Sequence, residues 1–237
     1  MKKRGQLTIF LIVAIIVIAV SALAFFMRGN FGFLNPEAQN VNNFVQDCLQ
    51  DASDKIVYAA AYGGGYLIPP NLSDELGFPY YYYGGENHMP SKEKMENEMS
   101  SNFGKIASLC IRNFQDFKET EITSGEISAT PTISEDKVSF EIIYPITIKQ
   151  GQSSTLLKDF KIEVQVRYGI VYNAVQEFLQ EQMTHDGICL NCALDIALKN
   201  DLYVDMQESE NGTIFSFRDE NSKINNETLE FVFINKY

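Results

Sequence analysis

Two cysteines separated by two residues form the clearest chemical motif of this 237-residue sequence. Cys189 and Cys192 enclose Leu190 and Asn191, and His185 lies four residues upstream. A C-x-x-C pair near the start of a helix is typical of thiol redox centres, because the positive end of the helix dipole stabilises a thiolate. The same spacing also suits a metal site or a plain structural disulfide. The motif alone therefore leaves three kinds of chemistry open.

The surroundings of the motif favour a structural disulfide. Thioredoxin-like redox proteins place the motif directly after a parallel strand, whereas a helix is expected before Cys189 here. A zinc site needs a second pair of ligands. Cys48 and Cys110 lie in separate expected helices, with no partner nearby in sequence. We therefore predict no metal and no cofactor, and we keep a thiol–disulfide oxidoreductase as the alternative to a non-enzymatic protein.

Cys48 and Cys110 both fall on the apolar faces of expected helices. If these helices pack together, a bridge between the two cysteines closes a loop of 62 positions. Such a bridge stabilises a fold by roughly 4 kcal/mol in the chain-entropy description. Two separately buried free thiols would fit only a reducing compartment.

Other catalytic signatures are absent from the sequence. Its two histidines are His88 and His185, and no Gly-x-Ser-x-Gly, His-Glu-x-x-His, phosphate-loop or dinucleotide pattern occurs. Residues 63–65 are three consecutive glycines, but they lack the lysine and the strand-before-helix setting of a phosphate cradle. We expect them to end a helix, and we predict no catalytic residue.

A run of four tyrosines is the most unusual local feature. Tyr80, Tyr81, Tyr82 and Tyr83 follow a proline and precede two glycines. Tyrosine rings combine apolar area with a hydroxyl group, so a loop of them would suit contact with a sugar, a peptide or a surface. The alternative, which we favour, is that alternate rings cover the edge of the core and the others are simply exposed.

Three asparagines begin N-glycosylation triplets, which agrees with an exported domain. They are Asn71, Asn211 and Asn226.

The N-terminal segment decides on which side of a membrane these residues lie. Residues 7–27 are 21 positions with Thr8 and Ser21 as the polar exceptions. A helix of this length reaches ~31 Å, about the thickness of the hydrocarbon core of a bilayer. Lys2, Lys3 and Arg4 precede it and keep the N-terminus cytoplasmic. We therefore predict an anchor over 1–28 in contact with membrane lipid through 7–27, a neck over 29–35, and an extracellular domain over 36–237.

The charge of that domain excludes one class of partner. All 31 acidic residues lie beyond residue 28, where 15 basic residues remain, so this part carries a net charge of −16. An acidic surface without a basic stripe repels nucleic acid. We predict no nucleic-acid partner.

The first ten residues resemble a known signal. The stretch over 3–10, KRGQLTIF, is similar to the class III signal of archaeal type IV pilin-like proteins. The resemblance covers about 30 residues and implies cleavage between Gly5 and Gln6, with the apolar helix then packing into a filament. Phe10 stands where that family usually has an acid that pairs with a neighbouring subunit. The opening also resembles uncharacterised archaeal single-pass membrane proteins. An uncleaved anchor, or cleavage after Ala24, remains open.

Hydrophobic periodicity and turn residues predict an α+β domain, with amphipathic helices followed by a mainly antiparallel sheet. We expect helices over 36–62, 91–118, 170–184 and 190–199, a long loop over 66–90, and strands over 126–133, 138–148, 156–168, 202–207, 213–218 and 229–234, with Pro145 marking an edge strand or a bulge.

These features predict a membrane-anchored protein of structural or assembly type, possessing pilin-like character. Its expected partner is a second copy of the chain or another envelope protein. The first alternative is a tethered binding module that uses the tyrosine run, and the second is an extracytoplasmic thiol oxidoreductase.

Overall fold

The structure is a computed structural model that describes Val17 and residues 36–237. The predicted anchor over 1–28, the neck over 29–35 and the cleavage pair Gly5 and Gln6 lie outside the described residues, Val17 aside. The chain divides into two compact units, Met1–Gln39 and Asn40–Tyr237. Within the described residues, no helix is both long enough and apolar enough to cross a membrane.

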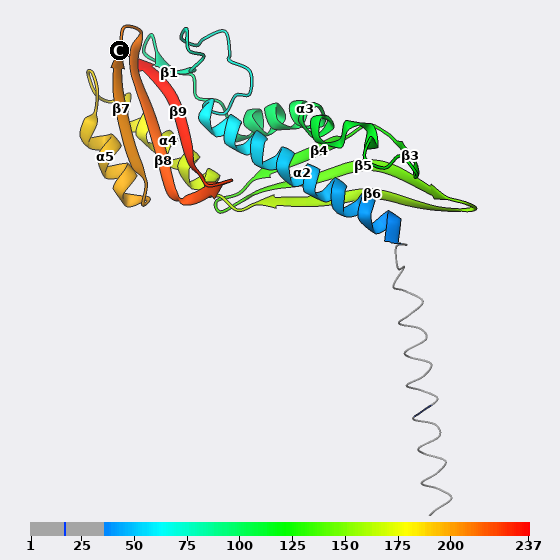
Figure 1. The fold of residues 1–237 in the computed structure, drawn as a ribbon. Helices are drawn as coiled ribbons and strands as arrows, with labels where there is room; N and C mark the ends of the chain where they lie inside the picture. The colour runs from blue at the N-terminus through cyan, green and yellow to red at the C-terminus, as the bar shows by residue number, and fades with distance from the viewer. Residues whose placement is uncertain (1–16, 18–35) are drawn as a thin grey trace, which may run out of the picture. The chain divides into compact units, whose positions relative to one another are not determined.

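From residue 36 onward the chain forms four α-helices and nine strands, which confirms the α+β class (Figure 1). In chain order they are α2 (Pro36–Tyr62), β1 (Tyr80–Tyr83), β2 (Glu86–Asn87), α3 (Lys92–Ile111), a 3-10 turn η1 (Arg112–Phe114), β3 (Glu121–Ser124), β4 (Ser128–Ile133), β5 (Val138–Gln150), β6 (Ser153–Val164), α4 (Tyr168–Gln182), α5 (Leu190–Lys199), β7 (Tyr203–Ser209), β8 (Gly212–Ile224) and β9 (Glu227–Lys236).

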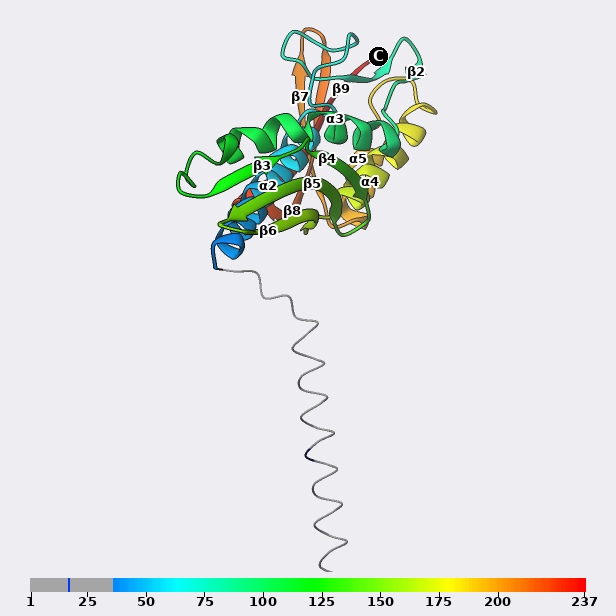
Figure 2. The ribbon, with the colours of Figure 1, turned by 90° about the vertical axis from the view of Figure 1, so that its right-hand side faces the viewer.

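The strands form two sheets rather than the single sheet that the sequence predicts. One sheet has the order β2-β1-β9-β8-β7, and the other has β4 and β3 along one side of β5 and β6 along its other side. Every pair is antiparallel except β1 with β9, which run parallel. Figure 1 shows the two sheets in different parts of the domain, the first with α4 and α5 and the second with α3, and Figure 2 gives the same arrangement from the side. Local patterns identify strands but not their partners, so the second sheet could not be foreseen.

Helix α2 has the predicted bounds because its ends are marked by special residues. Pro36 opens it, where a missing backbone N–H costs nothing. Three glycines follow Tyr62, and Gly64 and Gly65 adopt φ values of 55° and 81°. The N–H of Gly65 donates to the carbonyl of Ala60 and closes the last turn. Glycine adopts this left-handed backbone without steric penalty.

Helix α3 begins as predicted but ends earlier. The Ser91 hydroxyl accepts the N–H of Lys94 at 3.2 Å and so caps the start of the helix. The prediction that the helix continues to residue 118 is wrong. Arg112, Asn113 and Phe114 adopt positive φ, so the helical path is broken. This change of direction places the Phe114 ring 6.4 Å from the ring of Tyr144 in β5.

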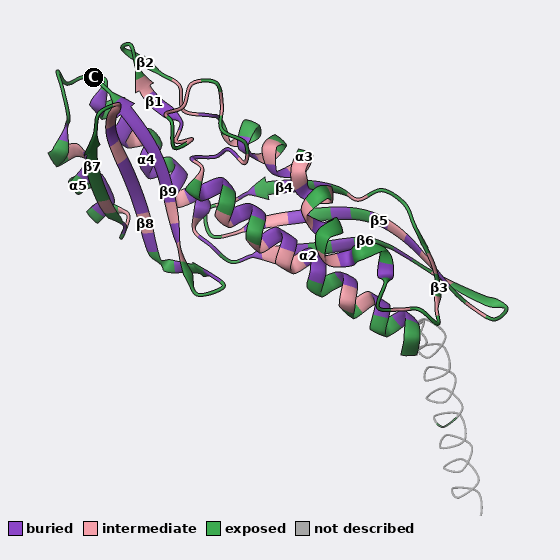
Figure 3. Cartoon of the chain, turned by 45° about the horizontal axis from the view of Figure 1, so that its top comes forward, coloured by how far each residue is buried: buried purple, intermediate pink, exposed green. Residues whose placement is uncertain are grey.

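A cluster of aromatic rings fixes α4 on the first sheet. Phe178 of α4 lies 5.0, 5.7 and 6.3 Å, between ring centroids, from Phe215, Phe217 and Phe233. All four side chains are fully buried. Figure 3 shows buried residues along α4, β8 and β9, whereas β7 and the outer side of α5 are exposed. Burial of such rings holds the sheet and the helix together.

Two strand predictions need correction. The segment predicted as a loop over 66–90 contains β1 and β2. Pro145 lies in β5, which is a central strand and not an edge, but the register with β6 shifts between Ile143 and Ile146, so the predicted bulge is confirmed. Proline has no backbone N–H to donate to a neighbouring strand. At the bulge, Pro145 lies outside the regular hydrogen-bond pattern, so no donor is needed there.

Candidate functional site

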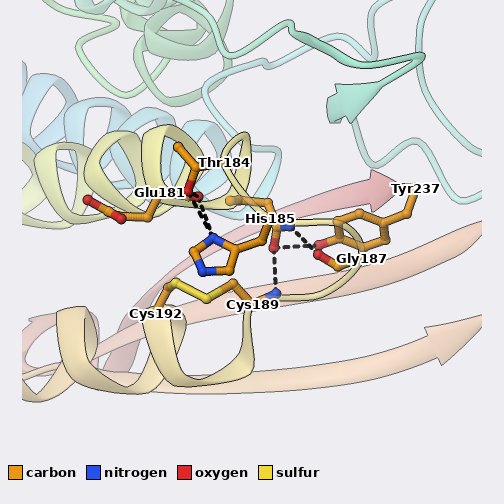
Figure 4. The surroundings of a disulfide bond; sticks show 8 residues. Glu181, Thr184, His185, Gly187, Cys189, Cys192 and Tyr237 are labelled. Atoms are coloured by element: carbon orange, nitrogen blue, oxygen red, sulfur yellow. Dashed lines mark hydrogen bonds between the residues drawn. A yellow bond between two sulfur atoms is a disulfide. The ribbon is translucent and has the colours of Figure 1, made fainter.

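The segment that connects α4 to α5 carries a disulfide beside a histidine, and we take it as the candidate functional site. Cys189 and Cys192 form a disulfide, with their Cα atoms 5.3 Å apart. Helix α5 begins at Leu190, so Cys189 is its cap residue (Figure 4). The prediction that this motif forms a disulfide is confirmed, and its structural or redox role stays open.

A buried glutamine holds the loop before the disulfide. The Gln182 side chain is fully buried, and its Oε1 accepts the N–H of Cys189 at 2.9 Å. The same oxygen accepts the hydroxyl of Tyr237 at 3.1 Å, and its amide nitrogen donates to the carbonyl of Gly187. One side chain thus connects the end of α4, the start of α5 and residue 237. Sequence reasoning missed it, because a single glutamine at a helix end carries no recognisable signal.

The His185 ring lies over the disulfide with one nitrogen already bonded. Its Nδ1 is 2.9 Å from the carbonyl oxygen of Glu181 and 3.0 Å from the Thr184 hydroxyl. A carbonyl accepts only, so Nδ1 carries the hydrogen in that bond, and the lone pair is on Nε2. Figure 4 shows the ring pointing this second nitrogen toward the two sulfurs. The nearest ring nitrogen and the two Sγ atoms lie within 4.8 Å of one another.

The disulfide opens onto a surface cavity of about 570 Å³. Its wall combines both cysteines and His185 with three acids, and the remaining positions are mostly apolar. The acids are Glu177, Glu181 and Asp195. The cavity is large enough for a side chain and adjoining backbone of a partner.

The same three residues have the donor types of a soft metal site. His185, Cys189 and Cys192 would supply one nitrogen and two sulfurs. Metals bind thiolates, and here both sulfurs are committed to the disulfide. Metal binding would therefore require prior reduction.

The second pair of cysteines joins two helices. Cys48 of α2 and Cys110 of α3 form a disulfide with Cα atoms 5.5 Å apart, which confirms the predicted bridge. Cys48 is 1% exposed. The ring of Phe44, one turn earlier on α2, lies 6.4 and 5.2 Å from the rings of Phe114 and Phe117. The bridge is thus part of a packed helix contact.

The four tyrosines form strand β1 instead of a loop. Tyr80 and Tyr81 are buried, Tyr82 is half-buried and Tyr83 is 39% exposed. The Tyr81 hydroxyl donates to the carbonyl of Gly64 at 2.7 Å, and its ring stacks on Phe233 at 4.6 Å. Burial of Tyr81 raises the pKa of its phenol. The first two rings therefore belong to the core, and a binding role for the run stays a prediction that rests on Tyr83.

A groove lined by apolar residues lies at the end of α2. Two adjoining cavities of about 610 and 380 Å³ share Tyr62, Leu76 and Phe78. The ring of Tyr62 stacks on Tyr58 at 6.4 Å and meets the edge of Phe78 at 5.9 Å. The second cavity is also lined by Asp205 and Glu230. We refer to this surface as the Tyr62 groove.

The Tyr62 groove has an acidic side. Burial raises the pKa of the Tyr58 phenol, and the nearby carboxylates of Glu227 and Glu230 raise it further. Negative charge beside exposed apolar rings favours a ligand that carries both basic and apolar groups.

The three glycosylation candidates occupy different settings. Asn71 and Asn226 are exposed, and Asn226 lies in the two-residue turn between β8 and β9. Asn211 is half-buried in the turn before Gly212, and its carbonyl accepts the Tyr80 hydroxyl at 3.3 Å.

One buried ion pair was not foreseen from the sequence. The Asp219 side chain is 0% exposed and accepts two bonds from the guanidinium of Arg167. The Ser222 hydroxyl donates to the same carboxylate and accepts the N–H of Arg167. Arg167 also donates to the carbonyl oxygens of Asn200 and Asp201. The cluster joins the start of α4, the end of α5 and a bulge in β8.

This cluster controls the ionisation of Asp219. Burial alone would raise the pKa of the Asp219 carboxyl. The bonds from Arg167, Ser222 and the N–H of Asn221, with the positive charge of Arg167, outweigh burial and leave the pKa below its ordinary value. The network lies within the fold and lines none of the cavities described above, so we assign it a structural role.

Compared with known proteins, the chain matches no family model, and it matches no curated protein and no solved structure.

Proposed function

We propose that this chain is a single-pass, membrane-anchored protein of structural or assembly type, with its folded domain outside the membrane. Residues 7–27 would hold it in lipid, as their composition predicts. The pilin-like start of the sequence supports a role in which this helix also packs against other helices.

The pairing of all four cysteines supports this proposal most directly. Both disulfides lie in the described domain, and one of them joins separate helices. Disulfides persist in oxidising compartments and are rare in the cytosol. The net charge of −16 beyond residue 28 also suits a soluble exterior surface.

The first prediction concerns topology. In intact cells that carry a tag after Tyr237, external protease is expected to remove the tag, because the lysines and arginine over 2–4 hold the N-terminus inside. N-terminal sequencing of protein from native membranes then separates the alternatives. A start at Gln6 supports the pilin-like assignment, and Met1 indicates an uncleaved anchor. A tag protected until the cells are lysed would refute the topology.

A second candidate function is a tethered binding module, and the Tyr62 groove favours it. We propose that its occupant is a segment of a partner protein with apolar and basic side chains. Leu76 is 74% exposed and Tyr62 is 44% exposed, so both can contribute contact area on binding. Glu230 would then meet a basic group, whereas Asp205 in the same wall is already paired with Arg218 at 2.9 Å.

The second prediction tests this groove on a peptide array with the full-length protein in detergent. Peptides with mixed apolar and basic side chains are expected to bind best, and Tyr62→Ala and Leu76→Ala should each weaken binding about tenfold. Leu156→Ala is the matched control, because Leu156 is 63% exposed and does not line the groove. Unchanged binding by Tyr62→Ala, or equal loss with Leu156→Ala, would contradict the assignment.

A further inference from the structure

We propose that the Cys189–Cys192 disulfide is a redox centre that exchanges with dithiols of partner proteins. The activity is separate from the structural role and from the Tyr62 groove. It depends on access to a sulfur, a base close to it, and a surface that can hold a partner.

The two disulfides differ in access. Cys192 is half-buried and lines a surface cavity of about 570 Å³. Cys110 is half-buried too, but neither it nor its partner Cys48, which is 1% exposed, lines any of the cavities described above. Thiol–disulfide exchange requires a thiolate to approach one sulfur directly. Cys189 is 9% exposed, so Cys192 is the sulfur that a partner reaches first.

The surroundings of the sulfurs favour a thiolate on Cys189. It is the cap residue of α5, a ten-residue helix, so the positive end of the dipole lies beside it. The free Nε2 of His185 lies beside the sulfurs and can accept a proton. Glu181 and Asp195 line the same cavity, and their negative charge opposes a thiolate, whereas Glu177 beside them is paired with Lys199 at 2.8 Å. That opposition limits the stability of the reduced state, which allows the pair to return to the disulfide.

Exposed apolar side chains at the cavity can hold a partner. Ile188 and Leu190, 42% and 45% exposed, line it, and Leu194, 42% exposed, lies one turn after Leu190 on α5. A partner with apolar side chains beside its cysteines, as in a chain that has not finished folding, fits this surface.

The exchange balances in two steps. A partner thiol gives its proton to Nε2 of His185 and attacks Sγ of Cys192. The bond between Cys189 and Cys192 breaks, and the Cys189 thiolate takes the proton from His185. The second partner thiol then attacks the partner sulfur of the mixed disulfide and releases Cys192, which takes its proton. The partner loses two electrons and two protons and gains a disulfide, and the pair 189/192 is reduced to a dithiol.

The test uses the full-length protein in detergent and a fluorogenic dithiol peptide with oxidised glutathione as the terminal oxidant. Wild type is expected to oxidise the peptide with turnover, and Cys189→Ser/Cys192→Ser should be inactive. His185→Ala should slow the reaction at least tenfold. His88→Ala is the matched control, since it removes the other histidine, which lies outside this cavity, and should keep the wild-type rate.

Two further measurements check that the variant is folded and that the two disulfides are reduced separately. Thermal unfolding should show that the double serine variant remains folded at the assay temperature. Differential alkylation in glutathione buffers should show Cys189 and Cys192 reduced under conditions that leave Cys48 and Cys110 paired. A rate for the wild type no higher than that of the double serine variant, or reduction of both disulfides together, would overturn the proposal.

Discussion

Replacement of Cys48 and Cys110 by serine is expected to lower the free energy of unfolding by about 4 kcal/mol. The bridge joins positions 62 apart and therefore removes much of the entropy of the unfolded chain. Urea unfolding of the full-length protein, followed by tyrosine fluorescence, measures the loss. Serine at position 48 would also leave a polar hydroxyl in a setting that is 1% exposed.

The second disulfide provides a matched control. Cys189→Ser/Cys192→Ser opens a loop with a separation of 3 positions, for which the chain-entropy description gives only about 2 kcal/mol. The double variant of the helix bridge should therefore be clearly the less stable of the two. Equal unfolding midpoints with and without reductant would show that the bridge between α2 and α3 does not stabilise the fold.

Asp219→Ala is expected to cost about 3 to 5 kcal/mol, because it leaves the partly buried guanidinium of Arg167 without its carboxylate. The Ser222 hydroxyl would lose its acceptor in a buried setting as well. The matched control is Asp205→Ala. That residue pairs with Arg218 on the neighbouring strand at 2.9 Å, but its side chain is 63% exposed, so the loss should stay within about 1 kcal/mol. A similar loss of unfolding free energy in both variants would show that the buried ion pair is worth no more than the exposed one.

The pH dependence of stability provides a second test of the Asp219 carboxylate. Its pKa is lower in the folded protein than in the unfolded chain, where it is about 3.9. The resulting stabilisation is complete above the unfolded value and is lost as the pH falls through the folded value. Unfolding curves between about pH 5 and pH 2 should therefore fall more steeply for wild type than for Asp219→Ala. Parallel curves would exclude Asp219 as the titrating group.

The parts of the fold that the sequence predicted well are those bounded by special residues. Helix α2 runs from a proline to three glycines, and α5 has the predicted bounds Leu190–Lys199. The three final strands were also predicted, because local pattern and turn residues agree there. Strand β3 was missed, since Ile122 is its one apolar residue.

The parts that could not be predicted depend on distant partners. The tyrosine run reads as a loop beside its glycines, and it becomes a strand because β9, some 150 residues later, lies next to it. Arg167 and Asp219 are likewise 52 positions apart, and nothing near either residue indicates the other. The sequence shows the spacing of Cys189 and Cys192 and the nearby His185, but the orientation of the imidazole ring toward the sulfurs is known only from the structure.

The parallel pairing of β1 with β9 has a consequence for how the domain matures. Tyr80 lies opposite Ile234, so an early segment of the domain completes its sheet with nearly the last one. A chain that emerges N-terminus first must keep one edge of its aromatic strand unpaired until β9 has followed, with only the two-residue strand β2 on the other edge. During this interval exposed rings and unpaired amides are open to wrong partners. Efficient folding therefore calls for either fast synthesis of the chain up to β9 or a chaperone that shields β1 until β9 pairs with it.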